Sequence, residues 1–219
     1  MMALSWLKLF MAAFRAARVL ILGLALPLCA QTTSTTSNRP PYKPQWFALA
    51  PSSVLHIDGY ELHETYDPET SERRDFIRVP GQSKAHQFYQ HSRGIDVALV
   101  PACQSLLVED NYTTKLSKLV MINLQSWVQK QISEAAVERY HEELKVEPST
   151  FVNARAVEIS ADCNCVLLAV ELTYASVASP ERAQEANKLY PTRWYTVNVK
   201  DGALRAAPQP TNVRDDIER

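Results

Sequence analysis

Three residues early in the chain have side chains that can bind a metal ion or exchange protons: His56, His63 and Glu64. Imidazole and carboxylate groups serve both as zinc ligands and as general acids or bases. The zinc-protease motif needs two histidines four residues apart on a helix. Here the fourth residue after His63 is Asp67, in a segment rich in β-formers. A metal-binding or hydrolytic site at these three residues is therefore an alternative to an ordinary polar cluster on a surface hairpin.

Other catalytic patterns are missing from the sequence. It contains no Gly-x-Ser-x-Gly elbow, no His-Glu-x-x-His motif and no glycine-rich phosphate loop. Only five glycines are present, and they are scattered. We therefore predict no catalytic residue, no cofactor and no resident metal ion.

The first 30 residues have the features of a secretory signal peptide. Lys8, Arg15 and Arg18 precede an uncharged run from Val19 to Leu28, and Ala30 offers a small residue for cleavage. This run is too short for a transmembrane helix, which needs about 20 apolar residues. An organelle transit peptide is less favoured, because its amphipathic pattern does not include a charge-free core. We expect export, with the periplasm as destination.

A second processing route would leave the protein attached to a membrane. Acylation of Cys29 would create a lipid-anchored envelope lipoprotein, whereas cleavage after Ala30 would release the chain. The bulky Leu28 before the cysteine disfavours acylation. We expect no transmembrane helix in the mature form, and a membrane tether only if Cys29 is acylated.

The remaining cysteines, Cys103, Cys163 and Cys165, would enter an oxidising compartment, where disulfides persist. A bridge between Cys163 and Cys165 would be strained, because only one residue separates them. We predict that Cys103 pairs with one of the two and that one thiol is left over.

The charge of the mature chain argues against a nucleic-acid partner. The leader holds three of the 23 basic residues and none of the 24 acidic ones, so the mature chain has a formal net charge of −4. Proteins that bind nucleic acid usually present an excess of basic residues.

Alternating and β-branched segments predict several strands. Asp58-Gly59 separates two such runs and favours a two-residue hairpin turn. Further strands are expected within the segments 75–79, 95–100, 151–160, 165–177 and 193–200, and a return strand after Asp201-Gly202. The polar segment 82–94 is predicted to be a loop.

A helix is predicted from about 113 to 145. Apolar residues recur there at steps of three and four, as they do on one face of an amphipathic helix. A short helix is expected from about 180 to 189, because Pro180 suits a first helical turn. The predicted fold is α+β, with one mostly antiparallel sheet packed against the long helix.

These elements predict four regions: a signal peptide (1–30), a disordered tether rich in Thr, Ser and Pro (31–45), one α+β domain (46–207) and a flexible tail (208–219). The function that fits best is an exported, non-catalytic interaction module of a bacterial cell envelope, whose partner is another envelope protein. The alternatives are a small periplasmic hydrolase or metal-binding enzyme using His56, His63 and Glu64, and a small-ligand carrier with a pocket between helix and sheet.

Overall fold

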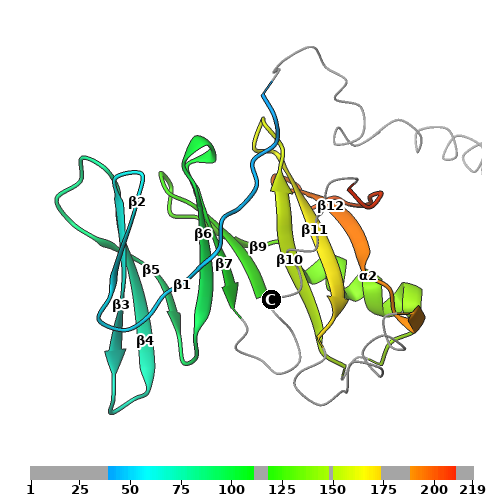
Figure 1. Ribbon diagram of the computed structural model, residues 1–219, viewed down its shortest axis with the longest axis horizontal. Coiled ribbons are helices and arrows are strands. Elements are labelled where there is room, and N and C mark those ends of the chain that lie inside the picture. Colours follow the sequence, from blue (N-terminus) through cyan, green and yellow to red (C-terminus); the bar gives the residue numbers. More distant parts are fainter. Residues whose placement is uncertain (1–38, 111–117, 148–149, 174–187, 211–219) are drawn as a thin grey trace, which may run out of the picture. The chain divides into compact units, whose positions relative to one another are not determined.

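The described part of the chain is built from antiparallel β-sheets. The computed structural model describes residues 39–110, 118–147, 150–173 and 188–210, all within the compact unit Thr36–Arg219. Figure 1 shows the strands in colours that run from blue at β1 to orange at β12. The three sheets have the strand orders β2-β3-β4-β5, β1-β6-β7-β8-β9 and β10-β11-β12-β13.

The sheet nearest the N-terminus begins with the predicted hairpin. β2 (Val54–Ile57) and β3 (Tyr60–Asp67) are joined by Asp58 and Gly59, which have φ values of 49° and 82°. Glycine and aspartate tolerate this left-handed backbone better than most residues, so the hairpin prediction is confirmed. β4 (Glu72–Arg78) and β5 (His86–His91) complete the sheet.

The loop prediction for 82–94 is wrong for its middle part, which forms β5. Polar residues at both ends of β5 conceal its pattern, and a β-bulge at Phe88 shifts the alternation by one residue. Period-two patterning therefore fails to reveal β5.

The second sheet is buried on both faces. It contains β1 (Phe47–Ala48), β6 (Ile95–Val100), β7 (Ser105–Asp110), β8 (Lys118–Asn123) and β9 (Gln129–Gln131). All six residues of β7 are buried, as in strands covered on both sides. Val97, Leu106 and Ile122 pack with the β2–β5 sheet, whereas Ala98, Leu107 and Met121 pack with the third sheet.

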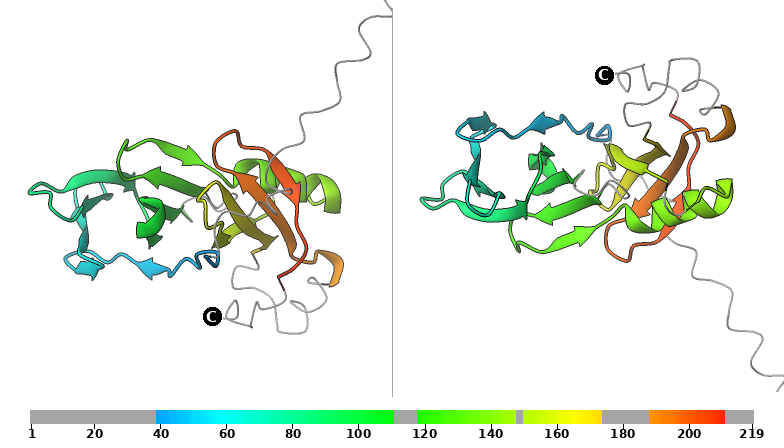
Figure 2. Two further views of the ribbon diagram at one scale, coloured as in Figure 1. Left: turned by 90° about the horizontal axis from the view of Figure 1, so that it is seen from above. Right: turned by 90° about the horizontal axis from the view of Figure 1, so that it is seen from below.

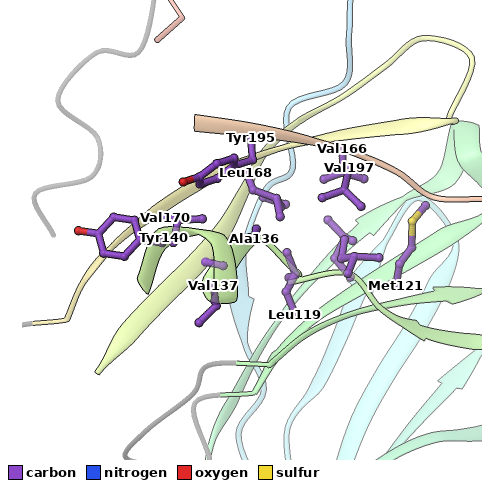
Figure 3. Close-up of a cluster of buried hydrophobic side chains, with 14 of the residues drawn as sticks. Leu119, Met121, Ala136, Val137, Tyr140, Val166, Leu168, Val170, Tyr195 and Val197 are labelled. Atoms are coloured by element: carbon purple, nitrogen blue, oxygen red, sulfur yellow. The ribbon is translucent and has the colours of Figure 1, made fainter. Parts of the chain in front are cut away.

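The third sheet packs together with a helix. It consists of β10 (Val152–Ile159), β11 (Cys165–Leu172), β12 (Arg193–Asn198) and β13 (Leu204–Ala206), and the helix is α2 (Glu134–Leu144). In Figure 3, Ala136, Val137 and Tyr140 of α2 lie against side chains of β8, β11 and β12. Figure 2 shows α2 beside the strands of this sheet in both views.

The predicted α+β class with a long helix at 113–145 is wrong. Residues 118–123 and 129–131 are strands, and the helix begins only at Glu134. A turn interrupts the apolar pattern: the Asn123 side chain accepts hydrogen bonds from the backbone N–H groups of Gln125 and Ser126, and Trp127 has a φ of 58°. Local side-chain bonds of this kind compete with helix formation.

Most other strand predictions are confirmed. The segment 75–79 overlaps the second half of β4, the segments 95–100, 151–160 and 193–200 contain β6, β10 and β12, and the return strand is β13. The predicted strand 165–177 contains β11, which ends at Leu172, and its residues 174–177 lie outside the described residues. Most of the predicted short helix 180–189 also lies outside them. No helix in the described ranges combines the length and apolar character needed to cross a membrane.

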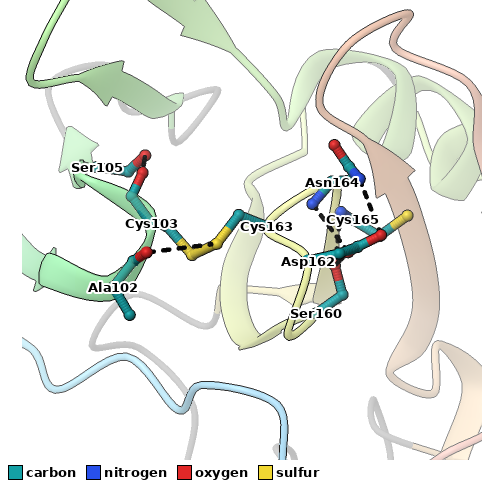
Figure 4. The surroundings of a disulfide bond; sticks show 8 residues. All are labelled: Ala102, Cys103, Ser105, Ser160, Asp162, Cys163, Asn164 and Cys165. Carbon is teal, nitrogen blue, oxygen red and sulfur yellow. Dashed lines mark hydrogen bonds between the residues drawn. A yellow bond between two sulfur atoms is a disulfide. The ribbon is translucent and has the colours of Figure 1, made fainter. Parts of the chain in front are cut away.

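A disulfide joins the second and third sheets. Cys103 precedes β7, Cys163 lies in the turn after β10, and their Cα atoms are 5.5 Å apart (Figure 4). Asp162 supports this turn by accepting hydrogen bonds from Ser160 and Asn164. The prediction that Cys103 pairs with Cys163 or Cys165 is confirmed. The expectation of a leftover thiol is wrong, because no cysteine among the described residues is free.

Candidate functional site

A cluster of ionisable side chains lies on the inner face of the β2–β5 sheet. Successive residues of a strand point to opposite faces. On this inner face Leu62 and Ile77 join the apolar core, and the next inward positions along the same strands are Glu64 and Asp75. His91 at the end of β5 completes the group, which we call the 64–75–91 cluster. Its three residues are 3 %, 0 % and 7 % exposed.

The geometry of the cluster brings like charges together. Glu64 and Asp75 are directly opposite in the β3–β4 register, an arrangement that is unfavourable for two carboxylates. His91 Nε2 lies 2.9 Å from Asp75 Oδ2 and 3.5 Å from Glu64 Oε2. The imidazole is thus the group on which both carboxylates converge.

The other ring nitrogen of His91 identifies the tautomer. Nδ1 is in short contact with the backbone carbonyl of Arg93. A carbonyl oxygen only accepts hydrogen bonds, so Nδ1 must carry the hydrogen. In the neutral ring, Nε2 therefore presents its lone pair to the carboxylates.

Arg73 supplies one positive charge at the rim. Its guanidinium donates to Glu64 Oε1 at 2.8 Å and lies 5.3 Å from the ring centre of Tyr66. The Arg73 side chain is 26 % exposed, so it connects the buried cluster with solvent. Two carboxylates face this single arginine.

Burial affects the acid–base behaviour of the carboxyl groups. Burial raises the pKa of Glu64 and of Asp75; Arg73 opposes this rise most strongly in Glu64, and His91 does so in Asp75. Beside them, the Tyr89 hydroxyl donates to Asp110 Oδ2 at 2.9 Å. Burial and this carboxylate raise the pKa of Tyr89. The phenol therefore stays protonated at neutral pH.

The structure separates the residues that the sequence suggested as a site. His63 lies on the outer face of β3, stacked on Phe76 with ring centres 5.1 Å apart, and His56 is exposed on β2. Glu64 points to the opposite, inner face. It therefore meets Asp75 and His91 instead of the two predicted histidines.

Sequence reasoning missed Asp75 and His91 for identifiable reasons. Asp75 stands at the start of the predicted strand 75–79 and in the middle of β4, where the alternation Asp75–Ile77 marks it as inward-facing. That signal was present. His91 could not be placed, because β5 was not recognised and its bulge conceals which residues point inward.

A groove runs along the outer edge of the same sheet. It has a volume of about 350 Å³ and is lined by Gln87, Phe88, Tyr89, Gln90 and Gln129. The Gln129 side chain crosses from β9 and donates to the Phe88 carbonyl at 2.7 Å. Near it, His86 stacks on Trp127 with ring centres 3.7 Å apart. This groove lies beside β5 and β9, and not between the helix and a sheet.

No protein-family model matches this chain, and no curated protein sequence is similar to it.

Proposed function

We propose that this chain is an exported, non-catalytic interaction module of a bacterial cell envelope, which binds an extended segment of a partner protein along β5. The observation that carries the proposal is the groove at the edge of a sheet, lined by four consecutive residues of β5. β5 pairs with β4 on one side and is the last strand of its sheet. An edge strand offers backbone groups that can pair with a strand from another chain.

The Gln129 side chain supports this proposal. A carboxamide resembles a peptide group, and here its NH₂ donates to the Phe88 carbonyl as the N–H of an added strand would. Gln129 itself is exposed, so it can rotate away when a peptide arrives. Gln129 therefore satisfies the Phe88 carbonyl of β5 while no partner strand is bound.

The lining indicates the chemistry of the bound segment. Gln87, Gln90 and Gln129 provide donors and acceptors but no charge, whereas Tyr89 adds part of an aromatic ring. Such a surface suits an extended, uncharged peptide that is held mainly through its backbone.

The leader motivates export, and the disulfide supports it. A bridge between Cys103 and Cys163 is typical of proteins that fold in an oxidising compartment. The periplasm, and a released rather than lipid-anchored form, remain proposals. The intact mass of the protein isolated from its host would report both the cleavage site and any lipid on Cys29.

The binding proposal is tested with a displayed library of random octapeptides, selected on the purified exported protein. Hydrogen exchange with a selected peptide should slow at the amides of β5 and not at those of β2, the other edge of the sheet. The double variant Gln87→Lys/Gln90→Lys should bind at least about tenfold more weakly, because edge lysines obstruct strand pairing.

The matched control is His56→Lys, which adds a lysine at an exposed position of β2. It should leave peptide binding unchanged. Protection of β2 instead of β5, or equal binding by the double variant and the parent, would contradict the proposal.

A further inference from the structure

We infer that Glu64, Asp75 and His91 form a binding site for a divalent transition-metal ion. This inference is independent of the peptide-binding proposal, which concerns the edge of the sheet. The ligand atoms of the three side chains all lie within 4.8 Å of one another, and all three residues are buried.

The first argument is the need for a positive charge between the three side chains. His91 Nδ1 faces the Arg93 carbonyl, so the lone pair of Nε2 faces Asp75 and Glu64. Without a cation, three acceptors would converge in a place from which water is largely excluded. Arg73 contacts only the far oxygen of Glu64, Oε1.

The second argument is the unpartnered state of the inner atoms. Within the described residues, neither oxygen of Asp75 takes part in a hydrogen bond, nor do Glu64 Oε2 and His91 Nε2. Asp75 is completely buried. A protonated His91 would make a well-directed, charge-assisted hydrogen bond to it. Such a bond at the 2.9 Å contact with Asp75 Oδ2 would still leave Asp75 Oδ1 and Glu64 Oε2 without a partner.

The third argument is distance. Metal–ligand bonds of about 2.1 Å place adjacent ligand atoms about 3.0 Å apart in an octahedron and about 3.4 Å apart in a tetrahedron. The Nε2 atom of His91 lies 2.9 Å from Asp75 and 3.5 Å from Glu64, close to these two spacings.

The surroundings have the supporting contacts found around metal ligands. Ligating histidines usually donate their other N–H to a carbonyl or carboxylate, and ligating carboxylates accept further hydrogen bonds. The Arg93 carbonyl and the Arg73 guanidinium occupy these roles for His91 and Glu64.

The donor set indicates the class of metal. One imidazole with two carboxylates suits Zn²⁺, Mn²⁺ or Fe²⁺, whereas Ca²⁺ and Mg²⁺ prefer oxygen ligands alone. Three protein ligands leave further positions open, so the ion would be accessible to a small ligand entering past Arg73.

The test is calorimetric titration of the chelator-treated, purified full-length exported protein with ZnCl₂ and MnCl₂, and with MgCl₂ and CaCl₂ for comparison. One equivalent of Zn²⁺ or Mn²⁺ should bind, and the melting temperature should rise. Asp75→Asn and His91→Gln should each weaken binding by about 100-fold or more. The matched controls Glu109→Gln, a buried carboxylate elsewhere, and His63→Gln, on the outer face of β3, should bind as the parent does.

A second measurement needs no variant. Mn²⁺ should broaden NMR signals of residues around His91 before those around His56 and His63. Absence of stoichiometric binding, broadening centred on His56 and His63, or binding that survives both ligand substitutions would overturn the inference. A preference for Ca²⁺ or Mg²⁺ would also count against it.

Discussion

The negative charges of two buried acidic sites in this protein are compensated in different ways. Glu109 on β7, 2 % exposed, accepts a hydrogen bond from Asn153 at 3.1 Å and lies 3.6 Å from Arg155 Nε. One carboxylate there meets one amide and one guanidinium. In the 64–75–91 cluster, two carboxylates and an imidazole lie together, and the single guanidinium of Arg73 bonds only to Glu64 Oε1.

This difference shows which buried charges are structural. Glu109 links β7 to β10 with partners that neutralise it, as expected of a contact between packed sheets. Among the described residues, the ion pairs of the 64–75–91 cluster lie within one sheet, and its acceptors outnumber its donors. An excess of acceptors in the interior marks the place where a cation binds.

The largest expected effect comes from removing the disulfide. This bond joins the same two sheets as the Glu109 site, whereas the 64–75–91 cluster lies in the β2–β5 sheet. Cys103→Ala/Cys163→Ala removes a link between residues 60 positions apart. Unfolding in urea should show a loss of about 4 kcal/mol, because the unfolded chain gains conformational freedom. The NMR signals around Glu109, between the same two sheets, should shift, while those around His91 should not. Equal NMR shifts around Glu109 and His91 would show that the disulfide does not distinguish the two sites.

The next effect is a test of the cluster itself. With Zn²⁺ bound to the parent, His91→Leu should lower the free energy of unfolding by about 3 kcal/mol, because the imidazole no longer completes the set of ligands that holds Glu64 and Asp75 together. Adding Glu64→Gln should restore part of the loss, since one carboxylate is then neutral. Thermal denaturation measures both variants. A stability of His91→Leu equal to that of the parent would show that the imidazole does not hold the carboxylates together.

Removing the positively charged partner of Glu109 should lower the free energy of unfolding by a smaller amount. Arg155→Met should cost about 1 kcal/mol, because Asn153 still donates to the carboxylate and the guanidinium is partly exposed. Urea unfolding measures the difference. A larger loss than for His91→Leu would reverse the ranking of the two sites.

The smallest effect concerns pH. Burial raises the pKa of Glu109 above its ordinary value of 4.5. The folded protein then holds a proton that the unfolded chain has released, so this residue makes stability fall as the pH rises above 4.5 toward the folded-state pKa. In Glu109→Gln, which cannot titrate, the fall between about pH 4 and about pH 7 should be shallower in urea unfolding. An unchanged pH slope would contradict the raised pKa.

Local signals determined much of the fold. The hairpin at Asp58-Gly59 and the strands within 95–100 and 193–200 depend on turn residues and short-range patterning, and they were predictable. The strands within the segment 113–145 were not predictable. An apolar strand that is buried on both faces lacks the alternation of polar and apolar residues that would distinguish it from a helix. Only the turn at Asn123 and pairing with β7 decide in favour of strands.

The candidate site illustrates the same division. The sequence by itself determined that Glu64 lies on a hairpin strand and that Cys103 would pair with Cys163 or Cys165. Tertiary structure alone chose Cys163 and brought Asp75 and His91 to Glu64 through the registers of three strands. The physical reason is that a side chain's direction follows from local alternation, whereas its neighbours depend on strand register, which bulges and long-range packing set.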